Sequence, residues 1–104
     1  MMDITDVKVF PVNEDRLKAY VSITIDDCFV VRDLKIIDGI NGLFVAMPSK
    51  KRKDGQFKDI AHPLDQETRD LIERKVFEAY ELEIRSMGQN LESLERLKNS
   101  AGDY

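Results

Sequence analysis

The stretch GLFVAMPSKKRKDGQF, residues 42–57, decides how the chain is organised. Its apolar segment, residues 43–47, predicts a strand with cover on both faces, and Pro48 ends that strand. Four consecutive cations follow: Lys50, Lys51, Arg52 and Lys53. The Asp54-Gly55 pair then predicts a tight turn. The stretch therefore predicts a buried strand that runs into an exposed basic loop.

The basic loop stands out because the rest of the chain is acidic. Residues 1–47 carry 5 Lys and Arg against 8 Asp and Glu, and residues 65–104 carry 6 against 10. Residues 48–64 carry 5 against 2, in a chain of 104 residues with a formal net charge of −4. A positive loop on an acidic protein favours a local site for a polyanion and argues against adhesion to nucleic acid over the whole surface.

Upstream of the loop, the sequence predicts antiparallel strands. Residues 18–25 alternate apolar and polar side chains, which is typical of a half-buried strand, and Asp26-Asp27 predicts a tight hairpin of open turn type. In residues 28–37 the apolar positions change parity near Arg32-Asp33, so either both faces are partly buried or a bulge shifts the phase. With residues 57–60 as a short last strand, about five antiparallel strands form a meander over residues 4–61.

The pattern becomes helical after His62-Pro63. Apolar residues recur every four positions from Leu64 to Ile84 and form a stripe that can pack on the sheet. Asp65 is the predicted N-cap, and Met87-Gly88 is the predicted end of a helix over about 66–86. The fold class is therefore α+β, an antiparallel meander followed by a C-terminal helix. Residues 2–86 form the domain, and residues 87–104 form an extension that is a short amphipathic helix or disordered.

The composition favours one folded domain in the cytoplasm. The chain is 42% apolar and 35% charged, which is typical of a folded, soluble protein. The sequence shows no secretory signal and no apolar run near the roughly 20 residues that a membrane span needs. Cys28 is the only cysteine, so no intramolecular disulfide can form and a reducing compartment is expected.

The lone histidine and the lone cysteine do not indicate an enzyme. His62 has no nucleophile and orienting acid grouped with it, so its expected role is a hydrogen bond that fixes the strand-to-helix turn. One histidine and the distant Cys28 do not make a metal site. We therefore expect no catalytic residue, no metal and no cofactor.

The basic loop has two interpretations. It is a candidate nucleic-acid-binding site, because a row of cations can neutralise phosphates, or it is a solvated hairpin tip whose lysines protect a strand edge from aggregation. The candidate binding residues are Ser49, Lys50, Lys51, Arg52, Lys53 and Lys58. Arg52 is the candidate for reading a guanine edge, since its planar fork can donate two hydrogen bonds to O6 and N7. Phe44 and Phe57 are able to stack on unpaired bases, although aromatic residues in strands more often belong to the core.

Several strings together resemble a known family. NGLFVAMPSK at residues 41–50 and DIAHP at residues 59–63 are its most specific parts, and ITDV at residues 4–7 and IDG at residues 37–39 accompany them. Over about residues 2–85 the chain resembles the stage V sporulation protein G (SpoVG) family, also called septation protein G.

The resemblance implies a small cytoplasmic bacterial protein, a meander sheet with a C-terminal helix, and a homodimer. It also implies binding of DNA, and in some members RNA, with roles in sporulation, asymmetric septation and gene regulation. The family's basic positions match Lys50 and Lys51. The run continues here at Arg52 and Lys53, where many relatives differ, and this departure is expected to raise affinity while relaxing base preference.

A homodimer is also expected from the residues alone, because a strand that is apolar on both parities needs more cover than one helix provides. An alternative function remains open at this stage. The protein would then be a non-enzymatic regulator of cell division that contacts only proteins through Leu91, Leu94 and Leu97, and the net negative charge fits that alternative better. No contact with a membrane is expected in either case.

Overall fold

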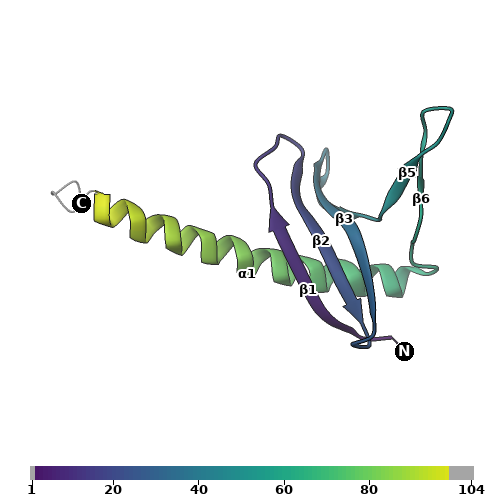
Figure 1. The fold of residues 1–104 in the computed structure, drawn as a ribbon, viewed down its shortest axis with the longest axis horizontal. Coiled ribbons are helices and arrows are strands. Elements are labelled where there is room, and N and C mark those ends of the chain that lie inside the picture. The colour runs from purple at the N-terminus through teal and green to yellow at the C-terminus, as the bar shows by residue number, and fades with distance from the viewer. Residues whose placement is uncertain (1, 99–104) are drawn as a thin grey trace.

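The structure, a computed structural model, describes residues 2–98, and it describes the side chains of residues 2–87. A four-stranded antiparallel sheet and one long helix make up its body (Figure 1). The strands follow one another across the sheet in chain order: β1 (Ile4–Pro11), β2 (Leu17–Ile25), β3 (Phe29–Gly39) and β4 (Gly42–Ala46). The helix α1 (Gln66–Lys98) covers one face of the sheet. The predicted α+β fold, an antiparallel meander followed by a C-terminal helix, is confirmed.

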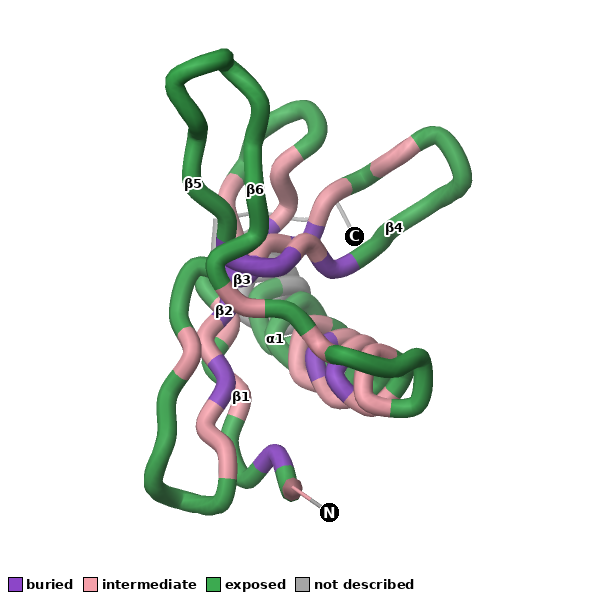
Figure 2. The backbone as a smooth tube through the Cα atoms, turned by 90° about the vertical axis from the view of Figure 1, so that its right-hand side faces the viewer, coloured by how far each residue is buried: buried purple, intermediate pink, exposed green. Residues whose placement is uncertain are grey.

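Two further strands form a separate hairpin that projects from the body (Figures 1 and 2). β5 (Ser49–Lys51) and β6 (Phe57–Asp59) pair only with each other. The predicted last strand is therefore present, but it does not join the main sheet, which has four strands instead of about five. The reason lies at Pro48, which has no amide hydrogen to continue the ladder of β4. The chain leaves the sheet there and pairs with itself.

The Asp26-Asp27 turn is a tight hairpin, as predicted. Asp26 and Asp27 have φ values of 50° and 57°, and the Cys28 amide donates to the Ile25 carbonyl at 3.0 Å. Two successive residues with positive φ define a type I′ turn, whose twist matches that of the flanking strands. The turn type that the sequence left open is thus settled by the backbone.

A β-bulge in β3 explains the change of parity near Arg32-Asp33. The pairing of β2 with β3 shifts between Val21 and Ile23, and Asp33 has a φ of 65°. Because the bulge inserts one residue, Val31 and Leu34 both face the helix although they are three positions apart. Of the two interpretations, the bulge is therefore correct.

The core lies between the sheet and the middle of α1. The sheet and the residues that follow β4 contribute the buried side chains of Ile4, Ala19, Val21, Ile23, Leu34, Ile36, Val45 and Met47. The helix contributes Ile72 and Val76. Only the middle of the predicted stripe is buried, because Leu64 is 93% exposed before the helix and Ile84 is 41% exposed beyond the sheet. Figure 1 shows the second half of α1 extending past the strands.

The helix begins where the sequence predicts but does not end there. The Asp65 carboxylate accepts a hydrogen bond from the Thr68 amide at 2.7 Å, which is the expected N-cap. The predicted end at Met87-Gly88 is wrong, because α1 continues through Gly88 to Lys98. A glycine inside a helix costs about 1 kcal/mol relative to alanine, which neighbouring residues with high helix propensity can offset. The Leu91, Leu94 and Leu97 backbone is helical, and their side chains lie outside the described part, as do residues 99–104.

Candidate nucleic-acid interface

The basic stretch forms the β5–β6 hairpin, and its register divides the cations between two faces. Lys50 lies directly opposite Lys58, and Lys51 lies opposite Phe57. Because successive side chains of a strand point to opposite faces, Lys50 and Lys58 share one face, which Arg52 continues toward the tip. Lys51 shares the other face with Phe57. The hairpin therefore has one face with three cations and one with a single cation beside an aromatic ring.

The tip of the hairpin is ordered by its backbone. The Gly55 amide donates to the Arg52 carbonyl at 3.0 Å, and the Arg52 amide donates to the Gln56 carbonyl at 2.7 Å. Gly55 has a φ of 87°, as a three-residue hairpin loop with a left-handed glycine requires. The Asp54 side chain accepts from the Gln56 amide at 3.0 Å. The predicted Asp54-Gly55 turn is confirmed, and none of these bonds uses the Arg52 or Lys53 side chain.

The base of the hairpin is closed by a hydrogen bond between its two strands and is anchored by two buried residues. The Ile60 amide donates to the carbonyl of Pro48 at 2.7 Å, and Met47 and Pro48 are both buried. The His62 ring lies just beyond, where Nδ1 donates to the Pro63 carbonyl at 3.0 Å. This is the kind of hydrogen bond expected of His62 at the turn into the helix. The cations are thus carried on an arm whose base is fixed.

Among the described side chains, the cations of the hairpin have no carboxylate partner. Every residue from 49 to 60 is exposed, and among the described side chains the one ion pair is Arg85–Glu81 at 2.6 Å, on the helix. Asp54 is engaged with a backbone amide, and Asp59 lies opposite Ser49, on the face away from Lys50 and Lys58. Two like charges directly opposite in a ladder are unfavourable unless an anion neutralises them. The Lys50–Lys58 pair is therefore an electrostatic feature suited to a bound phosphate.

All six predicted site residues lie on this hairpin, but they do not form one cluster. Lys50, Arg52 and Lys58 share the cationic face, Ser49 and Lys51 lie on the other face, and Lys53 lies in the tip. The two aromatic candidates, Phe57 and Phe44, are 68% and 43% exposed, so neither belongs to the core as aromatic residues in strands usually do.

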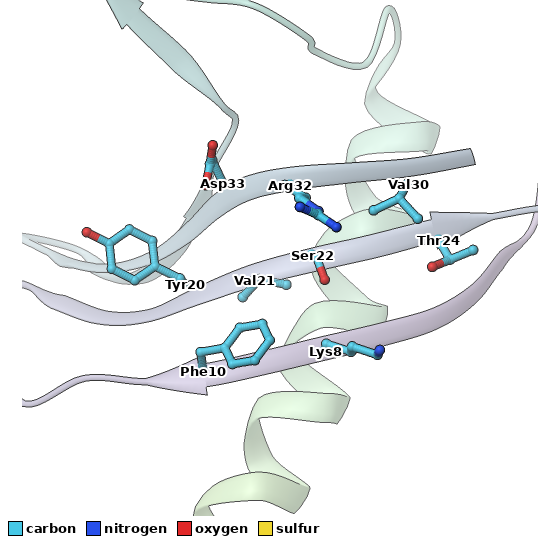
Figure 3. Close-up of a pocket in the computed structure, with 9 residues that line it drawn as sticks. All are labelled: Lys8, Phe10, Tyr20, Val21, Ser22, Thr24, Val30, Arg32 and Asp33. Atoms are coloured by element: carbon cyan, nitrogen blue, oxygen red, sulfur yellow. The ribbon is translucent and has the colours of Figure 1, made fainter. Parts of the chain in front are cut away.

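A second set of exposed residues was missed at the level of sequence. Phe10 and Tyr20 lie on the sheet face opposite the helix, together with Lys8 and Arg32 (Figure 3). The alternation of apolar and polar residues in β2 could have predicted this surface. The apolar side chains occupy the odd positions and face the helix, so the even positions, including Tyr20, lie on the outer face of the sheet. The bulge at Asp33 hid the same signal in β3.

Fold and hairpin together define a class: small α+β proteins with a four-stranded antiparallel sheet, a long C-terminal helix and a projecting basic arm. The family model described as SpoVG matches residues 2–82, most of the chain. This chain belongs to the SpoVG family.

The relatives in this family are named as septation proteins of the SpoVG type. That of Bdellovibrio bacteriovorus is 73% identical over 103 residues, which cover 99% of this chain and 95% of the relative. That of Anaeromyxobacter sp. strain Fw109-5 is 67% identical over 84 residues, 81% of this chain and 87% of the relative. That of Myxococcus xanthus is 66% identical over 80 residues, 77% and 81% respectively. These names describe a septation protein and no enzyme.

In the described part of the chain, α1 lacks the length of apolar sequence that crossing a bilayer requires.

Proposed function

We propose that the protein is a non-enzymatic regulator of septation and gene expression that binds DNA with the β5–β6 hairpin, with RNA as a further ligand. The observation that carries this proposal is the Lys50–Lys58 pair, two cations directly opposite each other on an acidic protein, with no described carboxylate within 4.0 Å of either. A role in sporulation and asymmetric septation, exercised in the cytoplasm, belongs to the same proposal and is supported by the family.

The shape of the hairpin supports duplex binding. The major groove of DNA is about 12 Å wide and admits a two-stranded β-ribbon. β5 and β6 form such a ribbon, which projects from the body with every residue exposed. Inside the groove, Lys50 and Lys58 contact phosphates as point charges, while Arg52 near the tip presents its fork to a guanine edge.

A second copy of the chain would bring two hairpins to one nucleic acid. The edge strand β4 and the overhanging part of α1 leave Leu43 and Ile84 each more than 40% exposed, where they line a groove of about 380 Å³. We propose that a two-fold copy covers this groove. Leu43→Lys should then convert a dimer into a 12.0 kDa species in sedimentation. A wild-type protein that already sediments as one 12.0 kDa species at micromolar concentration sinks the dimer.

The decisive experiment compares two variants with the same net charge. K50A/K51A/R52A/K53A removes four cations from the hairpin, and R69A/R74A/K75A/R85A removes four from the helix. The hairpin variant should lose about tenfold or more in affinity for a 20-base-pair duplex, and the slope of log K against log salt should shrink by about 0.9 for each phosphate contact removed. The helix variant should keep most of its affinity and slope. Equal losses in both would mean that only net charge matters.

Lys58→Glu separates binding from folding, because its two effects have opposite signs. Facing Lys50, a glutamate turns a repulsive pair into an attractive one and should stabilise the hairpin by about 0.2–1 kcal/mol. Binding should nevertheless weaken, since a phosphate contact is lost. The absence of salt-dependent duplex binding by the wild type would instead support a regulator that contacts only proteins.

A further inference from the structure

The sheet face opposite α1 carries a hollow that the hairpin does not use. In the described part of the chain this face has no helix over it, and a hollow of about 360 Å³ opens across β1, β2 and β3 (Figure 3). A volume of this size lies within the range of small-ligand pockets, about 300–1,000 Å³. Its lining includes Lys8, Phe10, Tyr20, Ser22, Thr24 and Arg32.

Two aromatic rings lie at one end of this hollow. Phe10 and Tyr20 are directly opposite each other in the pairing of β1 with β2, and they are 57% and 41% exposed. A cross-strand aromatic pair does stabilise a sheet, but such a pair leaves ring faces exposed only where nothing covers the sheet. An antiparallel sheet with a helix on one face and aromatic side chains on the other is a geometry on which unpaired bases stack.

Cations accompany the rings and indicate what kind of ligand the face would accept. Lys8 pairs with Ser22, Lys35 pairs with Tyr20, and the bulge that ends at Asp33 keeps Arg32 on the outer face. Among the described side chains, no carboxylate lies within 4.0 Å of these three cations. Asp33 also lines the hollow, but Figure 3 shows its carboxylate pointing away from Arg32.

The combination of rings and cations distinguishes a nucleic acid from an apolar protein partner. A docking protein segment would need an apolar surface without charge at its centre. Here Lys8 and Arg32 flank the centre of the face, the hydroxyl of Ser22 lies between them, and the hydroxyl of Thr24 lies farther along β2 (Figure 3). Both hydroxyls can donate to and accept from base edges. A base stacked on a ring, with its phosphate beside a cation, would satisfy both parts of this surface.

We propose that this open face binds single-stranded nucleic acid, with unpaired bases stacked on Phe10 and Tyr20 and phosphates held by Lys8, Arg32 and Lys35. The proposal deepens the nucleic-acid-binding function proposed above, since it adds a second site with a different ligand. Four strands about 4.8 Å apart form a face wider than the roughly 12 Å major groove, and the bases of a duplex are already stacked on each other. The hairpin therefore serves the duplex, and the sheet serves unpaired strands.

The test uses the full chain and two probes of equal length, a 20-base-pair duplex and a single-stranded oligothymidylate. F10L/Y20L keeps apolar side chains but removes both rings. Stacking contributes roughly 1–3 kcal/mol per base, so affinity for the single strand should fall by about 30-fold or more. Affinity for the duplex should stay within about twofold. Phe29→Leu is the matched control: Phe29 is 63% exposed but lies at the β2–β3 turn, and its loss should change neither probe.

A fluorescent adenine analogue, 2-aminopurine, placed within the single strand adds a readout of stacking itself. Its emission should be quenched on binding to the wild type and to Phe29→Leu, but not on binding to F10L/Y20L. Unchanged single-strand affinity and quenching in F10L/Y20L, with duplex binding intact, overturn this site and leave the hairpin function standing. Loss of both probes together with a change in sedimentation would show an interface between copies instead. Absence of binding to either probe by the wild type overturns both proposals.

Discussion

Only two residues of chain separate β4 of the body from the β5–β6 hairpin, yet the two regions are stabilised by different interactions. Among the described side chains of the body, ten apolar ones are buried between sheet and helix. In the hairpin every residue from 49 to 60 is exposed, and the conformation rests on backbone hydrogen bonds and one left-handed glycine. A two-stranded hairpin is marginally stable alone, so this one depends on its fastened base. Stability is therefore concentrated in the body, while the hairpin is free to carry charge.

The largest effect should come from a cavity in the body. Leu34 is fully buried at the point where the bulge of β3 turns it toward the helix. Leu34→Ala should lower the free energy of unfolding by about 2–5 kcal/mol, a large part of the 5–15 kcal/mol that holds a typical domain together. Urea denaturation followed by circular dichroism measures the loss.

Val30→Ala is the control on the same strand. Val30 is 51% exposed on the outer face, so its truncation should change the unfolding free energy by roughly 0.5 kcal/mol or less. If both variants lost the same free energy, the sheet would be covered on both faces. That result would also contradict the open face proposed as a binding site.

A smaller change in the free energy of unfolding should come from replacing a glycine of positive φ by alanine, once in the body and once in the hairpin. Gly42, the first residue of β4 after the β3–β4 turn, has a φ of 113°, and Gly55, in the hairpin tip, has a φ of 87°. A Cβ at either position would meet no atom within 4 Å, so the cost of Gly→Ala is conformational alone. It is roughly 1–2 kcal/mol where φ is positive. Gly42→Ala should therefore lower the global unfolding free energy, whereas Gly55→Ala should not.

Hydrogen exchange locates where the strain of Gly55→Ala is relieved. The amides of Arg52 and residue 55, which close the tip, should exchange faster in this variant, while the amides of β2 and β3 keep their protection. Equal losses of global stability in the two glycine variants would mean that hairpin and body unfold as one unit. The conclusion that stability is concentrated in the body would then be wrong.

The body was predictable where local rules decide the structure. The alternation in residues 18–25, the turn at Asp26-Asp27 and the cap at Asp65 all follow from nearest-neighbour chemistry, and the structure confirms each. The end of the helix was not predictable from Gly88, because a helix continues through glycine when its neighbours favour helix. The departure of residues 57–60 from the main sheet was not predictable either. It depends on which strand they meet after Pro48, and composition does not encode that.

The candidate site, too, could be predicted from the sequence only in part. The charge run located the hairpin, but the division of Lys50, Arg52 and Lys58 from Lys51 depends on the register, and the register depends on the three-residue loop. A two-residue loop at Asp54-Gly55 would have changed the cross-strand partners. The outer face was missed for a related reason, since one inserted residue at Asp33 moved the alternation of β3 out of phase.

The smallest effect should come from the junction of the two regions, where Asp65 caps the helix just after the hairpin ends. Hydrogen bonds from the Thr68 hydroxyl and, secondarily, from the Thr68 amide lower the pKa of the Asp65 carboxyl below its ordinary value of 3.8. A carboxyl with a lower pKa in the folded state stabilises the fold above its unfolded pKa, and this contribution disappears as the pH falls through the folded value. Thermal melting should therefore place wild type a few degrees above Asp65→Asn at pH 7, with the gap closing below about pH 4. Thr68→Val removes the hydroxyl but keeps the side-chain shape, so the pH-dependent part of the gap should shrink in that background. A gap that stays constant down to pH 3 would show that the cap acts through its shape and not through its charge.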